Sequence, residues 1–550
     1  MSTKNIQHDV PHSVLYAQQQ LSKLNPNDFS SLPSMFEKVC NDNKSAVAYS
    51  CMGKDIDYGE LNELSRSMAA YLVDVCNLKK GDRIAIQLPN ILQYPVVAWG
   101  ALRAGLVIVN TNPLYTAREM LHQFNDSGAK ALVVLSDLLP KAQALLKDTS
   151  IKTVISTSFM DLLATKASNN QSKAQSSPGI LVDFNDAIQQ GSLLALPDVI
   201  MSMNDLALLQ YTGGTTGVAK GAMLSHGNVF SAVRMTREFL KDVVIDREVI
   251  IAPMPLYHVY GFTMNVVSVL SVAGTSVLIP DPRDANSIID AMKRHTPTGM
   301  AGVNTLFQSL MEHPKFDEID FTQLRGAIGG GTALVKEIAD EWQSRTNQDI
   351  YEGYGLTETA GVLSCNIEGK RRLGTVGMAF DFMQVRAVGE DGSIKGAGEE
   401  GELWVRGPHV MQGYWKRDEA TSEVLDEDGW FRTGDVAIIE DDGYIRIVDR
   451  LKDMVLVSGF NVYPTEIESV VYTHPDVVEC AVIGVKDAKT GEAVKLFVNS
   501  KNPSLSADEL KEYCRKELTN YKVPKLIEFM KELPKSSVGK ILRRELRGNN

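Results

Sequence analysis

Two kinds of apolar pattern alternate along the first half of the chain. Short apolar runs typical of buried strands occur at 83–88, 106–109, 130–135 and 206–209. The segments 94–104, 117–127 and 229–233 instead have helical spacing. Strands that alternate with helices predict parallel βαβ units and an α/β sheet.

The pattern changes near Gly374, where helical spacing fades and short strands follow one another. The runs 436–439 and 444–448 flank Glu440–Gly443, a hairpin signal. Beyond the charged run 449–453 the pattern predicts a small α+β unit. Its predicted elements are helices after capping boxes at Thr465/Glu468 and Ser506/Glu509, and strands near 477–483, 495–499 and 526–530.

These patterns predict a multidomain α/β (α+β) protein, too long at 550 residues for a single core. A large N-terminal domain would span 1–448, with α/β subdomains and a β-rich subdomain. Residues 449–453 would form a hinge, and 454–550 a small mobile C-terminal domain.

Composition narrows the functional classes. A net charge of −12 argues against nucleic acid as a partner. The six cysteines have no Cys-x-x-Cys spacing, which indicates a reducing compartment, and a polar N-terminus makes a cytoplasmic protein the default. Residues 249–280 carry no Asp, Glu, Lys or Arg, but Pro and Gly interrupt them. They are interpreted as a buried segment lining an apolar pocket rather than a membrane span, with peripheral membrane contact left open.

The stretch 211–221 reads Tyr-Thr-Gly-Gly-Thr-Thr-Gly-Val-Ala-Lys-Gly and lies between a predicted strand and a predicted helix. Glycines let backbone N–H groups approach an anion, the threonines add hydroxyl donors, and Lys220 adds a positive charge. The pattern favours a phosphate loop over a simple turn. It is not a Walker A motif, because Lys220 lies between Ala219 and Gly221.

This loop resembles the phosphate loop of the adenylate-forming superfamily, and four further segments agree in the family's order. They are 255–258 (Pro-Leu-Tyr-His), 354–358 (Tyr-Gly-Leu-Thr-Glu), 428–453 and 534–540 (Pro-Lys-Ser-Ser-Val-Gly-Lys). The segment 428–453, with 112–116 and 457–464, is similar to bacterial long-chain fatty acid–CoA ligases. The resemblance covers nearly the whole chain.

The resemblance implies two displacement reactions that need no enzyme nucleophile. A carboxylate attacks the α-phosphate of ATP, giving an acyl-adenylate and pyrophosphate, and the thiol of coenzyme A then displaces AMP. Catalysis would come from positioning and charge stabilisation.

The resemblance also implies roles for individual residues. The phosphates would be held by Thr212, Gly213, Gly214, Thr215, Thr216, Gly217 and Lys220, with Thr212 also near the metal. Mg²⁺ would be bound by Glu358, and the α-phosphate by Thr357. The adenosine would contact Gly329, Gly330, Gly331, Tyr354 (stacked on the adenine), Gly355, Asp435 and Arg450 (both at the ribose).

Lys540 would enter the site and bridge the carboxylate and the α-phosphate. Lys452 matches the hinge, and rotation about it would bring Gly459 and Phe460 to the tunnel for coenzyme A. His258 would orient the carboxylate, although a satisfied core histidine is nearly as good an interpretation. The expected walls of the acyl pocket are Val259, Phe262, Val303, Asn304, Leu306 and Phe307.

The leading hypothesis is therefore a long-chain fatty acid–CoA ligase that uses ATP, coenzyme A and Mg²⁺. Three alternatives stay open: a fatty acyl-AMP ligase that loads a carrier protein, a medium-chain or aromatic acyl-CoA ligase, and a non-catalytic fatty-acid binder. The sequence leaves open the acyl chain length, and a homodimer is an expectation from the family alone.

Overall fold

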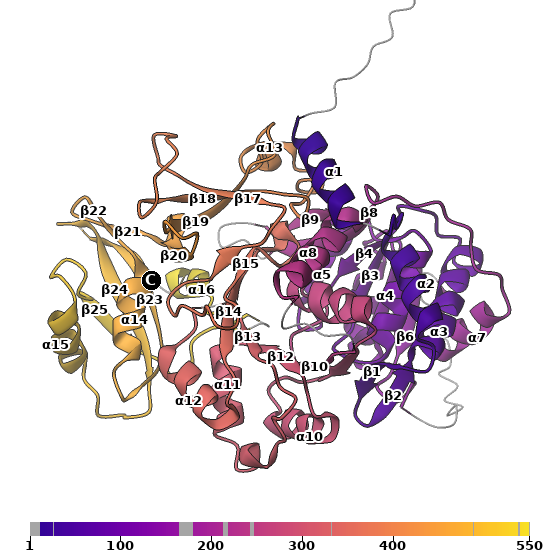
Figure 1. Cartoon of the computed structure of the whole chain (residues 1–550), viewed down its shortest axis with the longest axis horizontal. Coiled ribbons are helices and arrows are strands. Elements are labelled where there is room, and N and C mark those ends of the chain that lie inside the picture. The colour runs from indigo at the N-terminus through magenta and orange to yellow at the C-terminus, as the bar shows by residue number, and fades with distance from the viewer. Residues whose placement is uncertain are drawn as a thin grey trace, which may run out of the picture.

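The computed structural model describes residues 12–25, 27–163, 180–212, 218–241, 247–331, 333–487, 489–536 and 539–548. Within them the strands form four sheets, and the last of these lies with the C-terminal helices at one end of an elongated molecule (Figure 1). The first two sheets with their helices confirm the predicted α/β fold.

The first sheet has the strand order β7-β6-β5-β3-β4-β8-β9 and is parallel except for the pair β8–β9. Four of its strands, β3, β4, β5 and β8, carry the predicted apolar runs. The bounds are β3 (Arg83–Gln87), β4 (Val107–Asn110), β5 (Ala131–Leu135), β6 (Thr153–Thr157), β7 (Ile180–Asp183), β8 (Leu206–Thr212) and β9 (Lys220–Ser225).

The second sheet has the order β16-β15-β14-β13-β12-β10-β11-β1-β2, with a parallel centre and antiparallel ends. Its bounds are β1 (Val47–Cys51), β2 (Lys54–Asp57), β10 (Val249–Ala252), β11 (Thr275–Leu278), β12 (Gly299–Gly302), β13 (Ala327–Gly329), β14 (Ile350–Tyr354), β15 (Ser364–Cys365) and β16 (Met378–Ala379).

The β-rich part that follows Gly374 is a four-stranded antiparallel sheet, as predicted. It consists of β17 (Gln384–Val388), β18 (Glu400–Arg406), β19 (Phe431–Ile439) and β20 (Ile445–Arg450). Between β18 and β19 the chain returns to the first sheet, where Tyr414 forms a bridge with Ala222 of β9. The β-rich part is thus joined to the edge of the first sheet.

The last sheet belongs to the C-terminal unit. It contains β21 (Val455–Val457), β22 (Phe460–Val462), β23 (Val477–Asp487), β24 (Gly491–Ser500) and β25 (Leu526–Phe529), which adds parallel to β24. The predicted hinge residues end β20 and form the 3₁₀ turn Leu451–Asp453 between the two sheets. The domain boundary itself stays a prediction, because it concerns motion.

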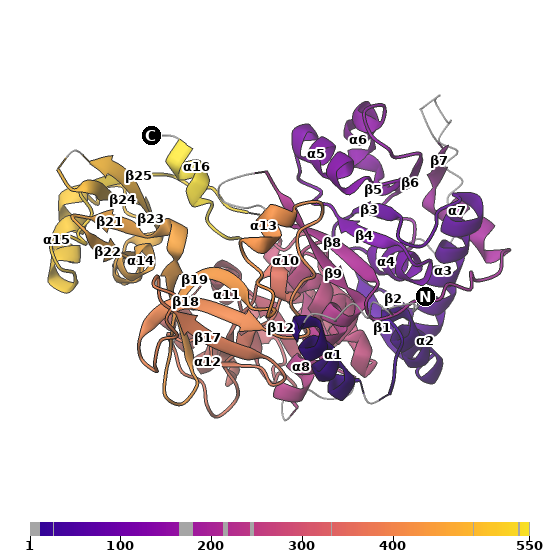
Figure 2. The ribbon, with the colours of Figure 1, turned by 90° about the horizontal axis from the view of Figure 1, so that it is seen from above.

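Helices cover both α/β sheets and pack on both faces of the C-terminal sheet (Figures 1 and 2). Their bounds are α1 (His12–Leu24), α2 (Leu32–Asp42), α3 (Tyr58–Ala70), α4 (Gln93–Arg103), α5 (Ala117–Ser127), α6 (Leu139–Leu146), α7 (Phe184–Ser192), α8 (His226–Phe239), α9 (Val259–Gly261), α10 (Ala285–His295), α11 (Asn304–Met311), α12 (Lys336–Thr346), α13 (Asp418–Ser422), α14 (Pro464–Tyr472), α15 (Ala507–Glu517) and α16 (Arg543–Gly548).

One of the two predicted capping boxes is wrong. Ser506 caps α15 as expected, with Glu509 completing the box. Thr465 instead lies inside α14, which begins at Pro464, and its N–H donates to Asp449 of β20 at 2.8 Å. Glu468 binds Arg543 rather than the backbone at the start of the helix. Tertiary partners therefore replace the local cap.

The uncharged segment 249–280 folds into short pieces, in agreement with its interpretation as a buried segment. It comprises β10, α9, the π-helical turn Phe262–Ser268, a 3₁₀ turn and β11. Among the described residues, no helix combines the length and apolar character needed to cross a membrane.

Candidate active site

A cavity of about 2660 Å³ lies where the two α/β sheets, the β-rich part and the C-terminal unit meet. Parallel sheets bind ligands beyond the carboxyl ends of their strands, and β8, β12, β13 and β14 all end at this cavity. Most of the predicted site residues in the described ranges line it. These are Thr212, Lys220, His258, Gly330, Gly331, Tyr354, Gly355, Thr357, Glu358, Asp435, Arg450, Lys452 and Lys540.

At one end of the cavity, Lys220 and Glu358 are linked through a tyrosine. Lys220 opens β9 opposite Thr212, and its Nζ lies 5.1 Å from the centre of the Tyr414 ring. The Tyr414 hydroxyl donates to Glu358 Oε1 at 2.7 Å. Gly213, Gly214, Thr215, Thr216 and Gly217, the remainder of the predicted phosphate loop, lie outside the described residues.

The turn that carries Glu358 depends on close backbone contact. A Cβ on Gly355 would lie 2.3 Å from the carbonyl oxygen of Gly361, so only glycine lets the chain cross itself here. Thr357–Thr359 forms a 3₁₀ turn, and the Glu358 carbonyl accepts from the Met411 N–H at 2.8 Å. The carboxylate therefore projects into the cavity from a fixed backbone.

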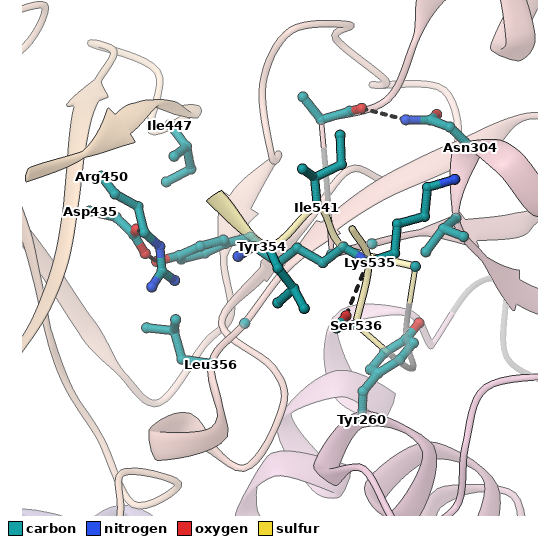
Figure 3. A pocket seen from close by; sticks show the side chains of 18 of the residues that line it. Tyr260, Asn304, Tyr354, Leu356, Asp435, Ile447, Arg450, Lys535, Ser536 and Ile541 are labelled. Carbon is teal, nitrogen blue, oxygen red and sulfur yellow. Dashed lines mark hydrogen bonds and ion pairs between the residues drawn. The ribbon is translucent and has the colours of Figure 1, made fainter. Parts of the chain in front are cut away.

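In the middle of the cavity, Asp435 joins two other predicted site residues (Figure 3). Arg450 Nε lies 2.8 Å from Asp435 Oδ1, and the Tyr354 hydroxyl donates to Asp435 Oδ2. Asp435 is 2% exposed, so the pair is not the surface ion pair that was the alternative interpretation. The triad offers a carboxylate, a guanidinium and an aromatic ring to a ligand.

Lys540 reaches the cavity from a hairpin of the C-terminal unit. Lys535 and Ile541 pair across the hairpin, and the Lys540 N–H donates to Ser536 Oγ at 3.1 Å (Figure 3). The side chain is open to the cavity, yet surrounding protein lowers its pKa to about 8, and the positive charge of Arg450 adds to this effect. Lys452 lines the cavity nearby, and its pKa is also lowered, chiefly by burial and then by Arg450.

His258 stands at the N-cap of α9, where its Nδ1 accepts from the Tyr260 N–H at 3.4 Å. Burial lowers the pKa of His258 to about 4, and the charge of Lys540 acts in the same direction. The imidazole is therefore neutral at physiological pH, and it lines the cavity rather than lying in the core.

The predicted acyl-pocket residues separate into two groups. Val259, Val303 and Asn304 line the cavity. Phe262, Leu306 and Phe307 do not line it in the described structure, because they are buried in the cores. Phe307 packs edge-on against Trp342, with 5.1 Å between the ring centroids.

Asn304 also fixes the loop before α12, because its amide donates to the Ala333 carbonyl and its Oδ1 accepts from the Val335 N–H. Other apolar side chains line the same cavity, among them Leu240, Met264, Val362, Val376 and Phe380.

Gly459 and Phe460, predicted for the coenzyme A tunnel, lie at the β21–β22 turn and do not line the cavity in this arrangement. Phe460 is 55% exposed and stacks on Tyr521 at 4.7 Å. Gly329 lies just behind the cavity wall formed by Gly330 and Gly331.

Two cavity residues, Tyr414 and Glu352, were not predicted from the sequence. Glu352 on β14 is 6% exposed, its Oε2 has no hydrogen-bond partner, and burial raises its pKa to about 8. Glu352 lies two residues before Tyr354, whereas Tyr414 lies outside the motifs named above. Nothing in the sequence marked either residue as part of the site.

Comparison with known proteins agrees with this geometry. Residues 36–415 match the family described as AMP-binding enzyme, and residues 466–540 match its C-terminal domain. The long-chain-fatty-acid–CoA ligase of Salmonella typhimurium is 43% identical over 537 residues, which cover 96% of each chain.

Among solved structures, ATP-bound MatB from Rhodopseudomonas palustris aligns with a TM-score of 0.83 at 30% identity, covering 94% of this chain and 99% of that one. The apo structure of MatB, with the same identity and coverage, aligns with a TM-score of 0.73. The chain as a whole thus superimposes better on the ATP-bound structure than on the apo structure of MatB. With both family domains matched in order, the chain belongs to the AMP-binding enzyme family of adenylate-forming enzymes.

Proposed function

We propose that the protein is a long-chain fatty acid–CoA ligase, which converts ATP, a fatty acid and coenzyme A into acyl-CoA, AMP and diphosphate. The observation that carries this proposal is a single cavity lined both by cationic side chains and by a set of apolar side chains. The near full-length similarity to long-chain-fatty-acid–CoA ligases supports the same substrate class.

The first step joins the carboxylate to the α-phosphate. An oxygen of the fatty acid bonds to the α-phosphorus, and the bond from that phosphorus to the β-phosphate oxygen breaks. Lys540 neutralises charge between the carboxylate and the α-phosphate, and Thr357 donates to that phosphate. Thr212 and Lys220 hold the phosphates that leave, together with the predicted loop 213–217. Preorganised charge of this kind is the main catalytic device available without a nucleophile.

The nucleoside would lie between the Gly330–Gly331 backbone and the triad of Tyr354, Asp435 and Arg450. Asp435 accepts from ribose hydroxyls and Arg450 donates to them. The neutral imidazole of His258 orients the incoming carboxylate without competing for the charge of Lys540.

The residues present fit a magnesium ion. Glu358 offers one carboxylate in the cavity, and one of its oxygens is already fixed by Tyr414. Among the described residues no group of three or more His, Cys, Asp or Glu side chains could hold a metal. A lone carboxylate suits Mg²⁺, which takes most of its other ligands from phosphates and water. When bound, the ion supplies neutralisation of phosphate charge.

The second step requires the C-terminal unit to move. We infer that the present arrangement, with Lys540 in the cavity, is the one that forms the adenylate. Rotation about Lys452 withdraws Lys540 and brings Gly459 and Phe460 to the cavity. The coenzyme A thiol then attacks the acyl carbonyl and AMP leaves. Contact with a membrane surface and a homodimeric state remain predictions.

The direct test is coenzyme A-dependent AMP release from ATP across saturated fatty acids from acetate to stearate. The proposal expects a maximum at long chains that requires coenzyme A. Release that ignores coenzyme A would instead indicate a ligase that loads a carrier protein. A maximum at medium chains would contradict the substrate class. No release with any acid would contradict an enzyme altogether.

A further inference from the structure

Tyr414 contacts two proposed catalytic residues at once, on different parts of its side chain. The hydroxyl donates to Glu358 Oε1 at 2.7 Å, and the centroid of the ring lies 5.1 Å from Lys220 Nζ. Glu358 comes from the turn after β14 and Lys220 from the start of β9, so Tyr414 bridges the ends of two different sheets. A cation over an aromatic face is attracted by the ring quadrupole.

The backbone of Tyr414 is held as firmly as a strand residue. It forms a bridge with Ala222, and the neighbouring Trp415 N–H donates to the Gly221 carbonyl at 2.8 Å. The N–H of Tyr414 donates to Thr421 Oγ1 at 2.9 Å. Tyr414 is 8% exposed, so its ring has little freedom to move.

The hydroxyl acts as the donor in its bond to Glu358, because a carboxylate oxygen only accepts. A donor of fixed position restricts rotation of the carboxylate it binds, and hydrogen bonds to a ligating carboxylate support metal binding.

We propose that Tyr414 is a positioning residue for adenylate formation, which aims the Glu358 carboxylate at the metal–nucleotide complex and steadies Lys220 beside the leaving phosphates. This inference rests on the metal role proposed above for Glu358. It adds a residue of the loop between β18 and β19 to the site and assigns separate tasks to its hydroxyl and its ring.

The variant Tyr414→Phe separates those tasks, because it removes the hydroxyl and keeps the ring. We expect the dissociation constant of ATP, measured by calorimetry with excess Mg²⁺, to rise about tenfold or more, the usual effect of losing a partner of a metal ligand. ATP affinity in EDTA should stay unchanged, since Lys220 keeps its ring contact. Thioester formation from supplied acyl-adenylate should also stay unchanged.

Tyr58→Phe is the matched control. Its hydroxyl donates to the Gly274 carbonyl at 2.7 Å in the core, away from the cavity. This variant should lower the melting temperature and leave the Mg²⁺ dependence of ATP binding untouched. A purely structural Tyr414 would make Tyr414→Phe behave in the same way, and that result would overturn the inference.

Glu358→Gln, alone and combined with Tyr414→Phe, distinguishes the two levels of proposal. If Tyr414 acts through Glu358, the double variant binds Mg-ATP no worse than Glu358→Gln alone. Additive losses would overturn the inference. If Glu358→Gln itself leaves the Mg²⁺ dependence unchanged, the proposed metal role of Glu358 is wrong, and the inference is wrong with it.

Discussion

Two lysines that line the cavity, Lys220 and Lys540, are held in opposite ways. Lys220 lies at the start of a strand, over a tyrosine ring whose hydroxyl is bonded to Glu358. Lys540 lies in a hairpin of the C-terminal unit, and the described residues provide no hydrogen bond or ion pair to its ammonium group. One cation is built into the large domain, and the other is brought to the cavity by a separate unit.

This difference between Lys220 and Lys540 indicates which of the two positive charges can act in both half-reactions. A cation fixed in the large domain can contribute in every orientation of the C-terminal unit. A cation in the hairpin contributes only while that unit is docked, and its lack of fixed partners leaves it free to bind a transient anionic group. Under the proposed rotation, mobility is thus confined to the charge needed in one step.

The largest expected effect is that of Lys540→Ala. Adenylate formation, followed by ATP–pyrophosphate exchange, should fall by about a hundredfold or more, because a positioned charge at the reacting centre is lost. Thioester formation from supplied acyl-adenylate should change little. Lys535→Ala is the matched control, since Lys535 lies in the same hairpin but pairs with Glu479. Equal loss in both half-reactions would refute the role of Lys540.

Lys452→Pro should produce the opposite pattern. Proline fixes its own φ angle and so restricts rotation at the proposed hinge. We expect adenylate formation to persist and thioester formation to fall at least tenfold, measured by single-turnover assays of each step. Lys452→Ala, which keeps the backbone free, should retain the second step. Unimpaired thioester formation by the proline variant would place the hinge elsewhere.

The pH dependence of adenylate formation should distinguish the two lysines more finely. The pKa of Lys540 is lowered to about 8, so the free enzyme loses this charge as the pH rises above 8. The value of kcat/KM for ATP in adenylate formation should then fall about tenfold per pH unit, because this parameter reports ionisations of the free enzyme. In Lys540→Ala the residual activity should lack this decline. Its persistence there would assign it to another group.

The smallest expected effect comes from Glu352, a buried carboxyl in the cavity wall that affects the pH dependence of protein stability. The pKa of Glu352 is raised from 4.5 to about 8, so the folded protein holds a proton that the unfolded chain releases. Stability is therefore lost as the pH rises from about 4.5 to 8, at roughly 1.4 kcal/mol per pH unit at most. Glu352→Gln should raise the melting temperature relative to the wild type at pH 8 and not at pH 4.5. The exposed Glu427→Gln is the control, and a parallel response of both variants would contradict the buried carboxyl.

Sequence patterns predicted helix ends correctly where residues near in sequence form the cap. The helix predicted at 117–127 is found as Ala117–Ser127, since a complete capping box at Thr116 and Glu119 begins it and left-handed Gly128 ends it. The capping box predicted at Thr465 is wrong, because the Thr465 N–H donates to the side chain of Asp449, at the start of the predicted hinge. Spacing along the chain could not reveal that partner.

The same division applies to the site. The ordered motifs of the sequence were sufficient to identify the family, the adenylate chemistry and the polar residues that now line one cavity, because each residue type matches a chemical need of ATP. The sequence could not exclude Phe262 and Phe307 from the acyl pocket or include Tyr414 and Glu352 in the site. Which face of an element meets the cavity, and which distant side chain completes a hydrogen bond, depend on how the sheets pack against one another, and only the tertiary structure determines that.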